Sequence, residues 1–170
     1  MVASDRPRRW PAYALAVLFL GYAAGKAVVA LEARLGFPGG PAVSAAEHEA
    51  YFMNVSVAQW LAVASGLLGA CVVVATVTPV GRRVPLPLML PVLGVMLLAV
   101  GGGAGTMVLD GFVGIGVGWQ WYHGMLGLIV IALFLETIRS YVAATRRATN
   151  RPGTAALSSS GTAAGRRSRR

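Results

Sequence analysis

The chain has 170 residues, of which 56% are hydrophobic and 12% are charged, and its formal net charge is +9. A typical soluble domain is about 45–50% apolar and about 25% charged. The charges here gather at the ends of four long apolar runs that lack the polar stripe of a soluble helix. This pattern excludes an ordinary soluble domain and predicts an integral membrane protein in contact with lipid headgroups. Nucleic acid is not an expected partner, because no soluble domain remains to hold it.

Redox and phosphate-binding motifs are also excluded. Cys71 is the single cysteine and lies within an apolar run, so the chain has no intrachain disulfide, CxxC pair or zinc cluster. The glycine runs at 101–105 and 114–118 follow no predicted strand and lack the lysine and the serine or threonine of a phosphate loop. We therefore expect no metal site and no cofactor.

The first span is predicted at residues 11–31, after a short basic start at residues 1–10. As a helix it would rise about 31 Å, which is roughly one bilayer core. A cleaved signal peptide is the alternative, since a basic region also precedes the apolar run of such peptides. The length of the run, Lys26 within it and the lack of an A-x-A site favour a retained span.

The connection at residues 32–54 is the longest one between spans, and glycine and proline open it. Ser44 and Glu47 then have the spacing of a capping box, which predicts a short helix at about 45–53. Its aromatic residues suit the headgroup layer, so we expect an interfacial helix. A lid over the end of the bundle is the alternative.

Three further spans are predicted at about 55–78, 85–109 and 119–142, and residues 143–170 should form a disordered basic tail. Small residues on these spans, including the glycines of the 101–105 run, and the pair Gly21 and Gly25 on the first span predict close helix contacts. Among the 15 basic residues, all but Lys26 and Arg34 fall on one side of this arrangement. The positive-inside rule then predicts that both termini are cytoplasmic. The fold class is an all-α four-transmembrane-helix bundle in the plasma membrane.

Lys26 is an unusual residue for an apolar span, because an intramembrane charge is costly and often functional. Its expected partner is Asp110, which the topology places at the same level of the membrane. A lysine that snorkels to the interface and a ligand or proton contact are the alternatives. Glu136 and Arg139 have the spacing of a local ion pair on one helix face.

Two histidines lie on the same side as Asp110. His123 follows Gln120 at the start of the fourth span, and His48 lies in the predicted loop helix. Two histidines with nearby carboxylates could bind a metal or handle protons, although their spacing matches no metal motif and no nucleophile–base pair is present. The candidate polar cluster is therefore Lys26, Asp110, Gln120, His123 and His48.

The pattern GYAAGK at 21–26 and the run WQWYHG at 119–124 resemble small actinobacterial four-span integral membrane proteins of unknown function. More remotely, the first helix is similar to that of the DoxX-like family. That second resemblance implies an association with quinone- or thiol-linked redox systems, while the first implies no activity and transfers no site residue.

Two functions follow as hypotheses. The favoured one is a non-enzymatic bundle that binds a membrane-protein partner, a second copy or a small ligand in a polar pocket. The alternative is a membrane-embedded enzyme or redox-associated subunit that uses the polar cluster. A transporter is less favoured, because four spans would need to oligomerise to form a pathway.

Overall fold

The computed structural model describes residues 8–149, and within them the chain is helical with no strand. Four helices are long and apolar enough to cross a membrane. The elements are α1 (Trp10–Leu31), α2 (Ala45–Glu49), α3 (Val55–Ala75), the 3-10 turn η1 (Gly81–Arg83), α4 (Leu86–Val113) and α5 (Trp121–Thr149). The chain is thus compatible with a multi-pass membrane protein, as its composition predicts.

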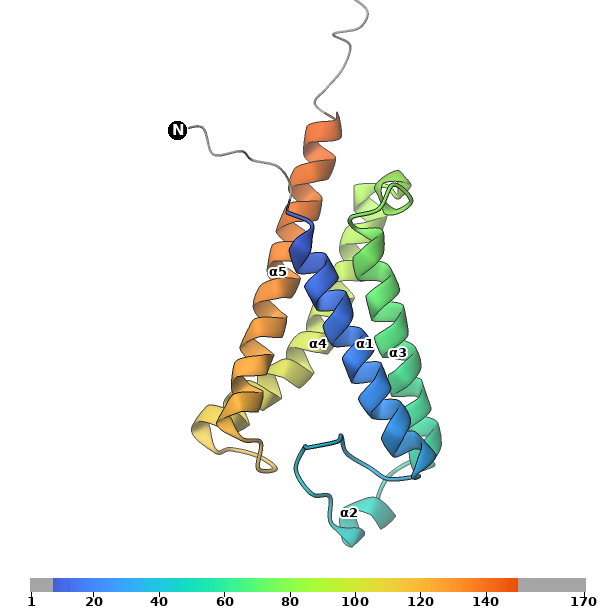
Figure 1. Cartoon of the computed structure of the whole chain (residues 1–170), viewed down its shortest axis with the longest axis vertical. Coiled ribbons are helices and arrows are strands. Elements are labelled where there is room, and N and C mark those ends of the chain that lie inside the picture. The colour runs from blue at the N-terminus through green and yellow to red at the C-terminus, as the bar shows by residue number, and fades with distance from the viewer. Residues whose placement is uncertain (1–7, 150–170) are drawn as a thin grey trace, which may run out of the picture.

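The four long helices form two pairs, α1 with α3 and α4 with α5. Figure 1 shows the pairs converging at one end and diverging at the other, where α2 lies. We call the converging end, with residue 8, η1 and the last turns of α5, the terminal end. The diverging end, with the α1–α3 and α4–α5 connections, is the loop end. The α1 and α5 helices also contact each other, and Phe19 meets Phe134 edge to face at 6.4 Å there.

Glycines of α3 hold the first pair together. A Cβ on Gly66 would lie 3.1 Å from that of Ala23, and one on Gly69 would lie 3.1 Å from the ring of Phe19. The absence of side chains therefore lets α1 and α3 approach closely. The predicted pair Gly21 and Gly25 does not make this contact. Gly21 meets nothing within 4 Å, and Gly25 faces the ring of Phe37 in the following loop.

The second pair also packs through glycine, but not through the predicted run on α4. Gly111 lies against Gly124 backbone to backbone, and a Cβ on Gly127 would lie 2.6 Å from the carbonyl oxygen of Ala104. The neighbouring glycines of α4 make no close contact with another helix, since a Cβ on any of them would meet nothing within 4 Å; they are Gly101, Gly102, Gly103 and Gly105.

The hydrophobic core lies toward the terminal end, where both pairs meet. Its buried side chains come from all four long helices and are Ala12, Leu15, Val73, Met89, Leu93, Phe134 and Tyr141. The Tyr141 hydroxyl lies 3.4 Å from the carbonyl oxygen of Gly81 and 3.3 Å from that of Val84, and ties α5 to the turn between α3 and α4. Gly81 lies so close to the Ala75 carbonyl that it has no room for a side chain.

Several helix ends differ from the prediction. The α4 helix passes Asp110 and ends at Val113, because Gly114 adopts a left-handed φ of 74° and closes the helix as a C-cap glycine does. The α5 helix continues to Thr149, so the first residues of the predicted disordered tail are helical, and the rest lie outside the described residues. At 28 residues, α4 is about 42 Å long and exceeds a bilayer core of about 30 Å, which favours a tilted helix.

Candidate functional site

Lys26 holds the first loop against the end of α1. Its Nζ donates a 2.8 Å hydrogen bond to the carbonyl oxygen of Gly36 and lies 5.8 Å from the ring centroid of Tyr22, within cation–π range. The Tyr22 ring in turn stacks on Phe37, with centroids 6.0 Å apart. The charge is therefore satisfied by the chain that directly follows its own helix.

The α3 helix supports the same loop with two polar side chains. Gln59 is buried, and its Nε2 donates to the carbonyl oxygen of Arg34 at 3.1 Å. Ser56 donates from Oγ to the carbonyl oxygen of Ala30 at 3.0 Å. The two bonds tie α3 to the last turn of α1 and to the start of the loop that follows it. Sequence reasoning did not single out Gln59, although a glutamine within an apolar span was a visible signal.

Asp110 holds the α4–α5 loop by hydrogen bonds to backbone, as Lys26 holds the first loop. Its side chain is 3% exposed, and Oδ2 accepts from the backbone N–H groups of Gly118 at 2.8 Å and Trp119 at 2.9 Å. Gly116, with a φ of 155°, lies so close that a Cβ there would be 2.9 Å from Oδ2. The carboxylate thus closes the α4–α5 loop over the end of α4.

His123 begins α5. Its Nδ1 accepts from the backbone N–H of Gln120 at 3.2 Å, which is the bond that the third helical residue makes in a capping box. The imidazole also packs edge to face on Trp119, with centroids 4.7 Å apart, and lies 4.2 Å from the Tyr122 centroid. His123 is therefore a packed and hydrogen-bonded histidine.

The structure brings together only part of the predicted polar cluster. Asp110 and His123 both contact Trp119 in the α4–α5 loop, Asp110 through the backbone N–H and His123 through the ring. The side chain of Gln120, the next residue, is exposed. The expected Lys26–Asp110 ion pair is not formed. Lys26 lies on the α1–α3 pair and Asp110 on the α4–α5 pair, and the two pairs diverge at this end (Figure 1).

The other predicted polar contacts are also local or absent. His48 is exposed on α2, away from the other candidates' hydrogen bonds. The predicted Glu136–Arg139 pair does not appear among residues 8–149, where Arg34 and Glu32 form an exposed pair at 3.1 Å. No group of three potential metal ligands occurs within the described part of the chain.

The two loops contact each other at Gly40 and Trp119. The edge of the Trp119 indole lies against Gly40, where a Cβ would be 3.1 Å from the ring. This contact links the α4–α5 loop to the α1–α3 loop across the diverging end of the bundle. A side chain at position 40 would be crowded against this ring. In the sequence, Gly40 is only one of several turn glycines.

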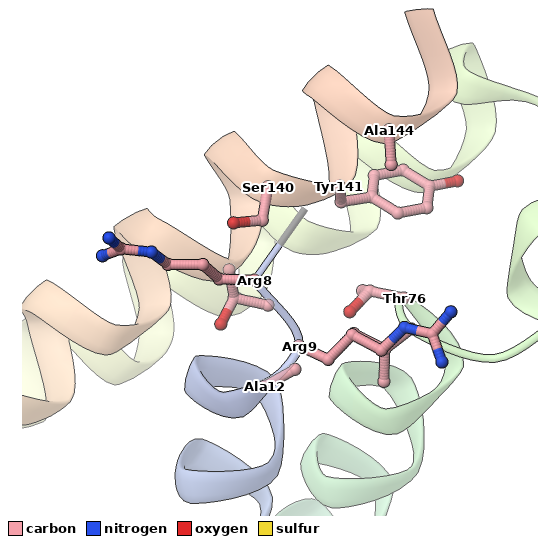
Figure 2. A pocket seen from close by; sticks show the side chains of 9 residues that line it. Arg8, Arg9, Ala12, Thr76, Ser140, Tyr141 and Ala144 are labelled. Carbon is pink, nitrogen blue, oxygen red and sulfur yellow. The ribbon is translucent and has the colours of Figure 1, made fainter. Parts of the chain in front are cut away.

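A notch at the terminal end was not predicted. It is lined by residues of the α1 entry, the end of α3 and the last turns of α5, and Figure 2 shows most of them: Arg8, Arg9, Ala12, Thr76, Val77, Thr137, Ser140, Tyr141 and Ala144. The two arginines point to opposite sides of the chain that enters α1 (Figure 2). In the sequence, the notch could have been sought at the arginine pair before the first span, which was used only to predict the orientation of the spans in the membrane.

The described side chains thus form two loop anchors, which are the hydrogen bonds of Lys26 to the α1–α3 loop and of Asp110 to the α4–α5 loop, and one basic notch. Within residues 8–149, no buried side-chain nitrogen or oxygen lacks a hydrogen-bond partner. No protein-family model matches the chain, and no curated protein or solved structure matches it either.

Proposed function

We propose that this chain is a non-enzymatic multi-pass membrane protein that seats a span of a partner membrane protein against α4. The observation that carries the proposal is the small-residue face of α4. Ala99, Gly102, Gly103 and Thr106 are all exposed on it, and Leu98, next to them, is 78% exposed. We call these four small residues the α4 face.

Glycine on a lipid-facing helix surface has a cost. Each glycine in a helix interior is less favourable than alanine by roughly 1 kcal/mol, and a larger apolar side chain would suit lipid better. Membrane helices use small residues where another helix approaches closely. Gly102 and Gly103 meet nothing of their own chain within 4 Å, so an approaching helix would have to come from another molecule.

The spacing of the α4 face fits such a contact. Gly102 and Thr106 are four apart, as are Ala99 and Gly103, and residues four apart lie on the same side of a helix. The Thr106 hydroxyl donates back to the carbonyl oxygen of Gly102 at 2.9 Å. That bond satisfies the hydroxyl of Thr106, the only polar side chain of the α4 face, so the face has no unpaired donor and no bulky side chain.

The polar residues support a binding role rather than catalysis. Lys26, Asp110 and His123 each make a hydrogen bond to backbone near the end of their own helix. A general acid or base needs its proton-transferring atom within reach of a substrate. These atoms are used to hold loops, which favours the non-enzymatic interpretation over the enzyme or redox-subunit alternative.

Charge supports an orientation in the plasma membrane with both termini cytoplasmic. Among the described residues, the terminal end carries Arg8, Arg9, Arg83, Arg139, Arg146 and Arg147. The loop end has Arg34 as its basic residue outside the spans, beside Glu32, Glu47 and Glu49. Basic residues collect on the cytoplasmic side of membrane proteins, so we place α2 and both loop anchors outside the cell.

Photo-crosslinking in the native membrane tests the proposal. A photoreactive amino acid at Gly102 should give a protein adduct, because the partner helix lies within contact of that position. The matched control is Gly21, which is exposed on α1 with nothing within 4 Å and should give lipid adducts. An adduct of twice the chain mass would identify the partner as a second copy. Lipid adducts alone at both positions would overturn the proposal.

A further inference from the structure

We propose that His123 acts as a pH-sensitive catch for the contact between the two loops at the loop end. We call the packing of the Trp119 indole against Gly40 the loop contact. It links the α1–α3 pair to the α4–α5 pair where the two pairs diverge (Figure 1). This inference concerns the loop end alone and does not depend on a partner at the α4 face.

One hydrogen bond of His123 exists in only one charge state of the imidazole. Its Nδ1 accepts from the backbone N–H of Gln120 at 3.2 Å. A ring nitrogen that accepts a hydrogen bond carries no proton, so the neutral ring has its proton on Nε2. In a protonated imidazole both nitrogens are donors. Protonation would therefore set two N–H groups against each other, and the ring would have to turn away from Gln120.

The position of His123 makes the cation unfavourable for a second reason. His123 is the third residue of α5, which begins at Trp121. The start of a helix carries a partial positive charge, and a cation is disfavoured there. The first turn of α5 contains no acidic residue that would offset this charge. A protonated His123 is thus less compatible with the observed arrangement than a neutral one.

Trp119 connects the imidazole to the loop contact. Its ring meets that of His123 edge to face with centroids 4.7 Å apart, and a Cβ on Gly40 would lie 3.1 Å from the same indole. Asp110 holds the backbone N–H of Trp119 at 2.9 Å, so the main chain is fixed there and the indole is the part that can move. When the imidazole turns away, the indole loses a packed neighbour and the loop contact weakens.

The other titratable groups near this contact are Asp110, Tyr122 and Lys26. Asp110 accepts from the backbone of the α4–α5 loop, and the Tyr122 ring centroid lies 4.2 Å from that of His123. Lys26 is bonded to the α1–α3 loop, in which residues 35–43 carry no charged side chain. Histidine is the side chain that ordinarily changes charge between about pH 5 and 8, whereas carboxylates, tyrosines and lysines do so outside that range. We therefore assign a response within this range to His123.

A distance measurement across the loop contact tests the catch. Spin labels are attached at Ala42→Cys and Val117→Cys, which are exposed positions in the two loops, in the full-length chain with Cys71→Ser. Double electron–electron resonance in lipid nanodiscs should give a narrow distribution of distances at pH 8. At pH 5 a longer distance should appear. The ratio of closed to open molecules should fall about tenfold, because one hydrogen bond is lost and a cation is left at a helix start.

Substitutions at the two histidines separate this response from other effects of pH. His123→Gln keeps an acceptor at the third helical residue, as in a capping box, and should stay closed at both pH values. His123→Lys places a cation without an acceptor there and should be open at both. The matched control is His48→Gln, which removes the other histidine of the chain and should keep the response. A response that persists in His123→Gln, or that disappears in His48→Gln, would overturn the proposal.

Nuclear magnetic resonance of the unaltered chain adds a test that does not depend on how the variants fold. Nitrogen-15 shifts of the His123 ring distinguish a proton on Nε2 alone from protons on both nitrogens. We expect the first form at pH 8. As the pH falls to 5, the second proton and a shift of the Trp119 indole N–H signal should appear together. Protonation of His123 without a change at Trp119, or no protonation down to pH 5, would overturn the proposal.

Discussion

The Nζ atom of Lys26 lies 2.8 Å from the carbonyl oxygen of Gly36, and this bond turns the first loop back over the end of α1. A charge within a membrane span usually marks a function, yet here a backbone carbonyl ten residues along the chain satisfies it. The Phe37 ring completes the contact by covering Gly25. Lys26 therefore acts first as a structural anchor of the loop end.

Replacing Lys26 with methionine should release this loop. The variant keeps the length of the side chain but leaves the Gly36 carbonyl without its donor, at a cost of about 1–2 kcal/mol. Hydrogen exchange in residues 32–44 should become faster in the reconstituted protein. Lys26→Arg retains a donor and serves as the control. Unchanged exchange in Lys26→Met would contradict the anchoring role.

Asp110 should be more sensitive than Lys26, because it is buried and accepts two backbone N–H groups on one oxygen. Asp110→Ala leaves both donors unpaired, and we expect a loss of about 3 kcal/mol in the free energy of unfolding. Asp110→Asn keeps an acceptor oxygen of the same shape and should lose about 1 kcal/mol. Unfolding of the micelle-bound protein by sodium dodecyl sulfate measures both. Equal losses would show that the negative charge, and not the acceptor geometry, closes the loop.

The spans could be predicted from the sequence because burial in lipid needs an apolar run of fixed length, and the charges fall between such runs. The ends of α4 and α5 could not be predicted in this way. The residues around Gly114 and after Val142 have the same composition as the loop and the tail that follow these helices. The faces of α4 could not be assigned either. The helix is apolar on every side, so nothing in the residues shows which glycines turn toward α5.

The loop anchors show a second limit of sequence reasoning. The sequence predicts an ion pair between Lys26 and Asp110 because these are the charged side chains at that level. It does not show that backbone groups, which almost every residue has, are the actual hydrogen-bond partners of both. For Asp110 a signal was present in the glycine-rich loop that follows it. Glycines at 116 and 118 with positive φ allow the chain to bring its N–H groups back to a carboxylate.

The α2 helix should depend on pH through its capping box. Glu47 Oε2 accepts from the hydroxyl of Ser44 at 2.7 Å and from its backbone N–H at 2.8 Å, and these bonds lower the pKa of Glu47. A lowered pKa means that the capping contribution is fully present above the ordinary glutamate value of about 4.3. It is then lost as the pH falls through the lowered pKa.

Nuclear magnetic resonance of the Glu47 amide, which donates to the Ser44 hydroxyl at 3.2 Å, would follow this transition. The amide should lose its helical shift below about pH 4.3, where the carboxylate takes up a proton. In Glu47→Gln the same amide should show no transition in that range. A transition centred above the ordinary glutamate pKa would mean that the capping bonds do not favour the charged form.

Substitutions of two glycines, Gly127 on α5 and Gly94 on α4, should distinguish a position in the contact between these helices from one outside it. A Cβ on Gly127 would lie 2.6 Å from the Ala104 carbonyl oxygen, whereas one on Gly94 would meet nothing within 4 Å. Gly127→Val should therefore force the helices apart and lower the free energy of unfolding by about 1–3 kcal/mol. Gly94→Val carries the same change in helix propensity and should leave stability close to that of the unaltered chain. Detergent unfolding of both variants measures the difference, and an equal loss at both positions would mean that α4 and α5 do not meet at Gly127.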